Sequence, residues 1–167
     1  MVSPPARAWM LQTMPNPEPR PIRPADVGEL HEMVRELADF EKIGHLVKSS
    51  PGDLADAIFG QRLLEALVID RPGGDGLAAF ALFYRNFSSF TGKPGLWLED
   101  LYVRPDFRGT GFGKSLFTAF IDTARQRGCG RAEWSVLDWN QPAVDFYRAH
   151  GGELMPDWRI CRITFKD

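Results

Sequence analysis

The stretch Leu96–Ser115 reads Leu-Trp-Leu-Glu-Asp-Leu-Tyr-Val-Arg-Pro-Asp-Phe-Arg-Gly-Thr-Gly-Phe-Gly-Lys-Ser. Its first part, Leu96–Val103, is rich in aromatic, Leu and Val residues and lies shortly before Pro105, which cannot continue a paired strand. The glycines of Gly109–Gly113 leave backbone N–H groups unshielded, and an apolar run with helical period begins at Leu116. We therefore expect a strand, a glycine-rich turn and a helix whose N-terminus attracts phosphate.

Two well-known phosphate motifs do not fit this turn. The dinucleotide fingerprint G-x-G-x-x-G would need glycine where Lys114 or Leu116 stands, and the Walker A loop would need glycine at Arg108. A nicotinamide or ATP site is therefore disfavoured. The pattern that remains is Arg-x-x-Gly-x-Gly at Arg108–Gly113, and its alternative interpretation is a turn that only joins strand to helix.

Length and composition predict one globular domain. The chain has 167 residues, of which 44% are apolar and 25% charged, so we expect a domain over residues 21–167 behind a flexible, proline-rich tail over residues 1–20. The net charge is −2 and no Lys/Arg run occurs, so neither nucleic acid nor a membrane is expected as a partner. A cationic substrate is compatible with this charge.

Cysteine and histidine usage argues against a metal site or a structural disulfide. Cys129 and Cys161 have no metal-binding or redox spacing, which favours a reduced, cytoplasmic setting. His31, His45 and His150 show no ligand pattern, so we expect no metal.

The remaining elements follow from periodicity and turn residues. We expect a short strand near Ile22–Pro24, a helix over Val27–Glu41 capped by Asp26, and a second, shorter helix that Ser50–Asp53 opens, that runs through Ala57 or Ile58 and that Gly60 terminates. A hairpin of strands Glu65–Asp70 and Leu77–Tyr84 and a loop over Arg85–Gly95 should follow. After the glycine-rich turn we expect a helix from Leu116 that ends at Gly128, a strand over Arg131–Leu137 parallel to Leu96–Val103, a helix from Asn140 that stops at Gly151, and a last strand over Trp158–Phe165. In the loop, Phe87 and Phe90 either pack on the sheet or line a substrate pocket.

This order of elements resembles the fold of the GCN5-related N-acetyltransferases, an α/β fold with a mixed central sheet of about six to seven strands and about four helices. Within that family the chain is most similar to the spermidine/spermine (diamine) and thialysine acetyltransferases. The matching segments are Ile22-Arg23-Pro24-Ala25, Glu36-Leu37-Ala38-x-Phe40-Glu41, Phe59-Gly60, Leu98-Glu99-Asp100, Arg108-Gly109-x-Gly111-x-Gly113, and Trp139-Asn140-x-Pro142 followed by Phe146-Tyr147.

The resemblance implies acetyl transfer from acetyl-CoA, with CoA as product, to a primary amine of a small molecule, directly within a ternary complex and usually in a homodimer. It implies that Tyr147 protonates the departing thiolate, that Glu99 acts as base through a water, and that Glu99 and Asp100 contact the amine. The cofactor-binding residues that it implies are Leu101, Val103, Arg108, Gly109, Thr110, Gly111, Phe112, Gly113, Lys114, Asn140 and Tyr147.

One departure bears on the acceptor. The polyamine enzymes carry an acidic residue in the loop before the Leu96 strand, whereas Phe87–Phe90 contains none, and an extra residue lies in Lys93–Gly95. A shorter amine or an amino-acid side chain therefore competes with polyamines. Two other functions remain open, namely a protein or peptide N-acetyltransferase and a non-catalytic acyl-CoA-binding module.

The chemistry of an amine acceptor fits the two carboxylates independently. An alkyl amine has a pKa near 10.4, so at neutral pH only about one molecule in a thousand is the free base, and a carboxylate that takes its proton is useful. Glu99 and Asp100 interrupt an apolar strand, where bare carboxylates are costly. Because adjacent strand residues face opposite sides, we expect at most one to point at the reacting centre. The alternative is that both form structural ion pairs.

Asn140 and Tyr147 are expected on one helix. Tyr147 lies two turns beyond Asn140 on about the same face, so the capping residue and the phenol can meet one ligand. A phenol of pKa near 10 can protonate a thiolate of pKa near 8.5 only slightly uphill. The alternative is that Tyr147 is a core residue.

Overall fold

The computed structural model describes residues 18–165. The chain forms two compact units that divide after Trp134, and each is described by itself. Most of the predicted tail lies outside the described residues. The predicted single domain remains a prediction.

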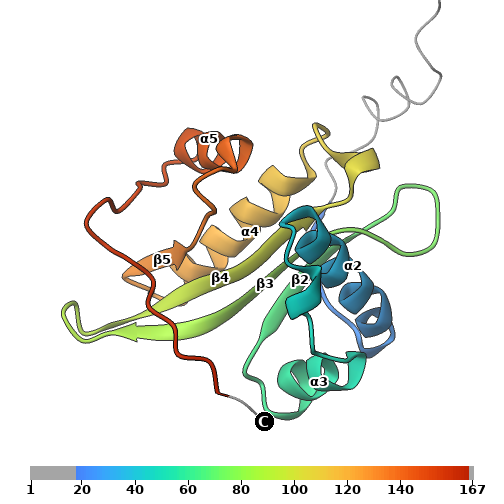
Figure 1. Ribbon diagram of the computed structural model, residues 1–167, viewed down its shortest axis with the longest axis horizontal. Coiled ribbons are helices and arrows are strands. Elements are labelled where there is room, and N and C mark those ends of the chain that lie inside the picture. Colours follow the sequence, from blue (N-terminus) through green and yellow to red (C-terminus); the bar gives the residue numbers. More distant parts are fainter. Residues whose placement is uncertain (1–17, 166–167) are drawn as a thin grey trace, which may run out of the picture. The chain divides into compact units, whose positions relative to one another are not determined.

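The first unit is built on a mixed five-stranded sheet with the strand order β1-β2-β3-β4-β5 (Figure 1). The strands are β1 (Arg20–Pro21), β2 (Glu65–Asp70), β3 (Leu77–Ser88), β4 (Lys93–Val103) and β5 (Arg131–Trp134). The first four pair antiparallel, and β5 pairs parallel to β4, as the intervening helix predicted. The α/β class is confirmed, although the described residues contain five strands instead of six or seven.

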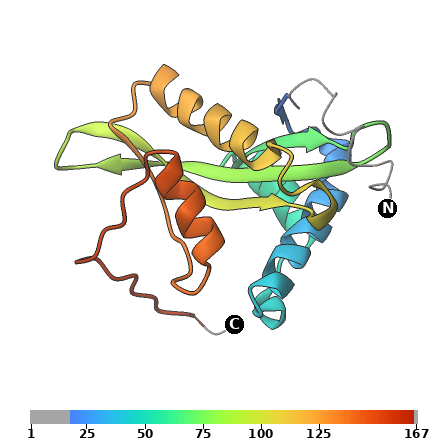
Figure 2. The ribbon, with the colours of Figure 1, turned by 90° about the horizontal axis from the view of Figure 1, so that it is seen from above.

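Helices cover both faces of this sheet (Figure 2). Helices α2 (Val27–Phe40) and α3 (Pro51–Ala55), the latter continued by a π-helical turn over Asp56–Gly60, lie on one face. Helix α4 (Phe112–Gln126) covers the other face. None of the described helices is long and apolar enough to cross a bilayer.

The core on the α2 side follows the apolar stripe of that helix. Leu30 and Met33 are fully buried and pack with Phe80 and Leu82 of β3 and Tyr102 of β4. These side chains recur every three to four residues on the helix and every second residue on the strands, which is why one face of each element is buried.

On the opposite side of the sheet, α4 packs through aromatic pairs. The ring centroids lie 5.4 Å apart in Phe83–Phe120 and 5.2 Å apart in Phe117–Trp134.

Arg104, the residue after β4, ties α2 to the sheet. Its buried guanidinium pairs with Glu29 and, at 2.9 Å, with Glu36, and it donates to the carbonyl of Leu77 at 2.8 Å. A buried cation that satisfies two carboxylates and a carbonyl holds its partners in one geometry. The position of α2 against the end of β4 is therefore constrained electrostatically as well as by packing.

The first strand and the start of α2 share an ion-pair network. Arg20 contacts Asp26 at 2.7 Å and Asp70 at 2.6 Å, and Asp26 also accepts the backbone N–H of Arg23 at 2.8 Å. The carboxylate of Asp26 therefore does not cap α2 through its side chain, contrary to prediction, because Arg20 and the Arg23 backbone engage it.

The predicted loop over Arg85–Gly95 is wrong. The ladder of β3 and β4 continues through the pairs Arg85↔Leu96 and Asn86↔Gly95 to Ser88↔Lys93, so a long hairpin replaces most of the loop. Phe87 and Phe90 are 65% and 95% exposed. Neither is buried against the sheet, since Phe87 lies near the end of β3 and Phe90 lies in the turn that joins β3 to β4.

The second unit contains helix α5 (Gln141–Ala149). Asn140 caps it as predicted, since its Oδ1 accepts the N–H of Ala143 at 3.3 Å. The predicted strand over Arg131–Leu137 ends at Trp134. The predicted strand over Trp158–Phe165 does not form in the structure, and the described part of this unit holds no strand with which it could pair. Its large apolar side chains are exposed, namely Trp158, Ile160, Ile163 and Phe165.

Candidate functional site

The candidate site begins with a register shift in β4. Leu82 of β3 pairs with Asp100 and the next residue, Phe83, pairs with Leu98, so Glu99 is an extra residue with no partner opposite. Such an insertion is a β-bulge, which interrupts the alternation of side chains and increases the local twist. The bulge falls on the two carboxylates that the sequence analysis singled out.

The bulge places both carboxylates on the α2 face. Asp100 lies opposite Leu82, a member of the core beneath α2. Glu99 accepts a hydrogen bond from the indole Nε1 of Trp97 at 3.1 Å, so the two side chains lie on one face. Trp97 pairs with Tyr84 of β3. Tyr84 lies two residues beyond Leu82 and therefore shares its face, which is the α2 face. The expectation that Glu99 and Asp100 face opposite sides is therefore wrong, since it assumed a regular strand.

Asp100 lies in an unusual electrostatic environment. Burial, the neighbouring charge of Glu99 and the charge of Glu41 raise the pKa of Asp100 to about 7. Burial also raises the pKa of Glu41, which follows the last residue of α2. Neither Glu99 nor Asp100 forms an ion pair with any residue between 18 and 165. An ammonium group brought to this cluster would offset the repulsion between the carboxylates.

Aromatic side chains border the two carboxylates. The rings of Tyr84 and Trp97 lie 6.5 Å apart at an interplanar angle of 31°. Burial and the charge of Glu99 raise the pKa of the Tyr84 phenol. Aromatic faces beside carboxylates suit an organic cation, which gains from both.

Sequence reasoning did not assign roles to Glu41, Tyr84 and Trp97. Trp97 had a usable signal, because it precedes Glu99 by two residues in a strand and therefore shares its face. Tyr84 and Glu41 had none, since their proximity to the carboxylates depends on the strand register and on where α2 ends.

The glycine-rich turn has the predicted anion-binding geometry. Gly109 and Gly111 have φ values of 74° and 91°, a left-handed conformation that side-chain-bearing residues rarely adopt. Gly111 precedes the first residue of α4, and no side chain caps this helix in the structure. The N–H groups of Phe112–Lys114 therefore begin a 15-residue helix without intrahelical partners. This donor set fits a pyrophosphate.

The side chain of Arg108 is engaged by the protein itself. Its Nε donates to the carbonyl of Val103 at 2.9 Å, and its guanidinium carbon lies 5.1 Å from the ring centroid of Phe40 and 5.6 Å from that of Tyr102. Arg108 thus links the turn to α2 and β4. Because the Arg108 side chain makes these contacts within the protein, the charge of Lys114 is more available to an anion than that of Arg108.

Beyond the bulge, β4 loses its second neighbour. The parallel ladder with β5 runs from Gly95↔Arg131 to Leu98↔Trp134 and stops there. Leu101 and Val103 therefore lie on a part of β4 that pairs with β3 alone among the described strands. A Cβ added at Gly113 would come within 3.6 Å of a methyl group of Val103, so the turn and this open edge are close.

Asn140 and Tyr147 lie in the second unit. Asn140 is the N-cap of α5, and Tyr147 lies on the same helix next to Phe146, with ring centroids 5.3 Å apart. The structure thus brings Glu99, Asp100 and the glycine-rich turn into one unit. It assigns Asn140 and Tyr147 to the other.

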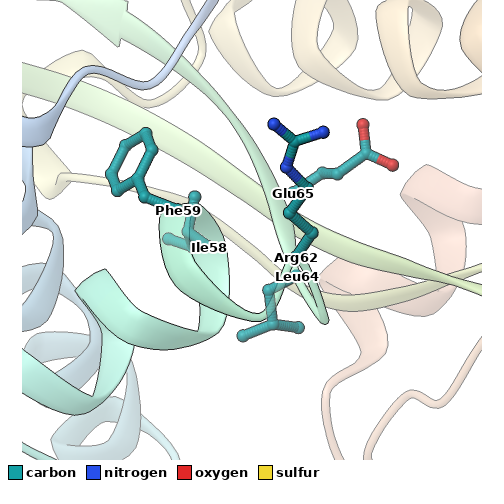
Figure 3. Close-up of a pocket in the computed structure, with 5 residues that line it drawn as sticks. All are labelled: Ile58, Phe59, Arg62, Leu64 and Glu65. Carbon is teal, nitrogen blue, oxygen red and sulfur yellow. The ribbon is translucent and has the colours of Figure 1, made fainter.

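A separate cavity of about 310 Å³ lies in the first unit (Figure 3). It is lined by Ile58, Phe59, Arg62, Leu64 and Glu65. None of the predicted site residues lines it. The Glu65 carboxylate in its lining is paired with Arg127 at 2.5 Å.

The comparisons with known proteins show the family of the chain. The model of the acetyltransferase (GNAT) family matches residues 30–151. An L-ornithine N5-acetyltransferase of Arabidopsis thaliana is 29% identical and covers 98% of this chain and 95% of its own length. A thialysine N-epsilon-acetyltransferase of Mus musculus is 37% identical, with coverage of 80% and 82%. Among solved structures, an integron cassette protein from the mobile metagenome of V. cholerae superposes with a TM-score of 0.74 at 21% identity, covering 91% of this chain and 94% of its own.

The pKa of Asp100 predicts how stability depends on pH. The folded protein keeps a proton on Asp100 up to about pH 7, whereas an ordinary aspartate loses it near 3.8, so the free energy of unfolding falls as pH rises between these values. We expect Asp100→Asn to remove this loss and to be more stable than the wild type at pH 8 by about 1 to 3 kcal/mol. Urea denaturation at pH 4 and pH 8 measures the difference. Asp75→Asn, in an exposed turn, is the control, and parallel pH profiles for wild type and Asp100→Asn would contradict the assignment.

Proposed function

The chain belongs to the GNAT family of acetyltransferases, and from this premise we propose that it transfers the acetyl group of acetyl-CoA to a primary amine of a small molecule. The observation that carries the proposal is the pair of carboxylates at the β4 bulge, which share one face and form no ion pair with residues 18–165. Unpaired carboxylates beside aromatic rings favour an ammonium group over any anionic or neutral acceptor.

Acetyl-CoA supplies the acetyl group as a thioester. We assign its pyrophosphate to the N–H groups of the turn and of Phe112–Lys114, and its pantetheine arm to the open edge of β4 at Leu101 and Val103. Asn140 and Tyr147 complete the assignment, at the reactive end of the cofactor. The left-handed glycines and the uncapped N-terminus of α4 support it, because they leave amide donors free for an anion.

The acceptor that we favour is an amino-acid side-chain amine or a short diamine. The two relatives described above are named for ornithine and thialysine, and each of these compounds carries two amino groups. Glu99 and Asp100 offer one carboxylate for the amine that reacts and one for the second. The Phe87–Phe90 segment has no acid that would extend this site toward a longer polyamine.

Two groups of this chain move protons in the proposed reaction. Glu99 is exposed at the bulge and takes the proton of the ammonium group, directly or through a water, which creates the nucleophilic amine. The free amine attacks the carbonyl carbon of the thioester, and the C–S bond breaks. The Tyr147 phenol gives its proton to the departing thiolate, and the resulting phenolate takes the second proton of the nitrogen, which leaves the amide and the CoA thiol. Asp100 holds the second cationic group and does not transfer a proton.

An amine panel tests this proposal. We expect thiol release from acetyl-CoA with ornithine, lysine, thialysine and short diamines, weaker release with spermidine, and none with peptides. Tyr147→Phe should lose rate and retain affinity for CoA, which separates a catalytic role from cofactor binding. Absence of turnover with every amine would overturn the proposal, and acetylation of peptides alone would transfer it to a protein acetyltransferase.

Substitution of Gly111 tests the cofactor assignment. Gly111→Asp brings a carboxylate to the proposed pyrophosphate site and a side chain to a φ of 91°, so we expect affinity for CoA to fall by more than about tenfold. Isothermal titration calorimetry measures it. Gly73→Asp is the matched control, because Gly73 has a φ of 68° in the β2–β3 turn and open space around its Cβ. Equal CoA affinity in Gly111→Asp and wild type would refute the assignment.

We also propose that the protein is a homodimer. The exposed side chains of Ile160, Ile163 and Phe165 support this, since a second copy that covers them would remove apolar surface from water. We expect light scattering after size-exclusion chromatography to give twice the mass of one chain. The double variant Ile160→Lys/Ile163→Lys should shift the protein toward the monomer, whereas a monomeric wild type would disprove the proposal.

A further inference from the structure

The side chain of Trp97 contacts the carboxylate that we propose as the base. Its indole Nε1 donates to Oε2 of Glu99 at 3.1 Å, and no other described residue donates a hydrogen bond to this carboxylate. Glu99 is the extra residue of the bulge, so its backbone has no partner directly opposite to fix its direction. The indole is therefore the contact that restricts where the Glu99 carboxylate points.

The position of Trp97 is itself supported. Trp97 pairs with Tyr84 on the neighbouring strand. Their ring centroids lie 6.5 Å apart at an interplanar angle of 31°, so the Tyr84 ring lies beside the indole. Trp97 is half-buried, whereas Glu99 is exposed. A tryptophan has few rotatable bonds and a single N–H donor, and a donor held in this way can orient a mobile carboxylate.

The bond also distinguishes Glu99 from its neighbour. No residue between 18 and 165 donates a hydrogen bond to the Asp100 carboxylate, and the charges of Glu99 and Glu41 act on it. The titratable groups around this cluster are Glu41 from the end of α2, Tyr84 from β3, and Glu99 and Asp100 from β4. The bond thus acts on the carboxylate that must accept a proton.

We propose that Trp97 is a positioning residue for the acetyl transfer, holding the Glu99 carboxylate by its indole N–H in the orientation that accepts the proton of the acceptor amine. This inference rests on the proposed function, because it assumes that Glu99 is the base. Trp97 does not touch the reacting atoms. Its effect is transmitted through Glu99, and the Tyr84 ring limits its own movement.

The kinetic test uses Trp97→Phe, which keeps a smaller aromatic ring next to Tyr84 and removes the pyrrole ring with its N–H donor. We expect kcat/KM for the acceptor amine to fall about threefold to tenfold, the range expected for loss of one partly exposed hydrogen bond to a charged group, while KM for acetyl-CoA stays unchanged. Trp158→Phe, an exposed tryptophan of the second unit, is the matched control. An unchanged kcat/KM in Trp97→Phe would overturn the inference and leave the proposed function standing.

A spectroscopic test is independent of turnover. The indole N–H resonance of Trp97, identified by its absence in Trp97→Phe, should shift in one pH step as Glu99 ionises. We expect the step to disappear in Glu99→Gln and to persist in Asp100→Asn. A resonance that does not titrate, or one whose step survives Glu99→Gln, would show that the indole does not hold this carboxylate. If the wild type acetylates no amine, the proposed function fails, and this titration still decides whether Trp97 positions Glu99.

Discussion

The β-bulge at Glu99 is the constraint on which the candidate site depends. A regular β4 would send Glu99 and Asp100 to opposite faces, and one of them would enter the apolar layer beneath α4. The extra residue turns both toward α2. Just before it, at Leu98, the parallel pairing with β5 also stops, which leaves the next part of β4 with a free side. One local irregularity thus produces both an acidic site and an open strand edge, as expected where a bulge bends a strand and ends its pairing.

The acidic site is electrostatically costly, and the surrounding structure maintains it. Burial raises the pKa of Asp100, and the negative charges of Glu99 and Glu41 raise it further. The ion pairs of Arg104 with Glu29 and Glu36 keep α2 in place although its C-terminal end carries a carboxylate of the same cluster. Unfavourable local interactions of this kind concentrate at functional sites, where a bound ligand relieves them. Here that ligand would be a cation.

Local sequence predicts the geometry of the anion-binding turn better than it predicts that of the acidic site. Gly109 and Gly111 adopt the left-handed conformations that their glycine identity permits, and the helix that follows supplies amide donors whatever lies elsewhere in the fold. One detail still depended on distant residues. The guanidinium of Arg108 packs on Phe40 and Tyr102 and bonds to the Val103 carbonyl, so its side chain helps to anchor the turn.

By itself, the amino-acid sequence determined the α/β class, the parallel crossover through α4, the glycine-rich turn, the Asn140 cap and the presence of two carboxylates in an apolar strand. These features depend on residues close together in the chain, through periodicity, capping and the conformational freedom of glycine. Only the tertiary structure decided that β3 and β4 pair as far as Ser88 and Lys93 and that residues 158–165 form no strand. It alone also decided that Glu99 and Asp100 share a face, where Trp97 and Glu41 lie near them. Strand register and bulges depend on which distant residues pair, and no local pattern in the chain specifies that pairing.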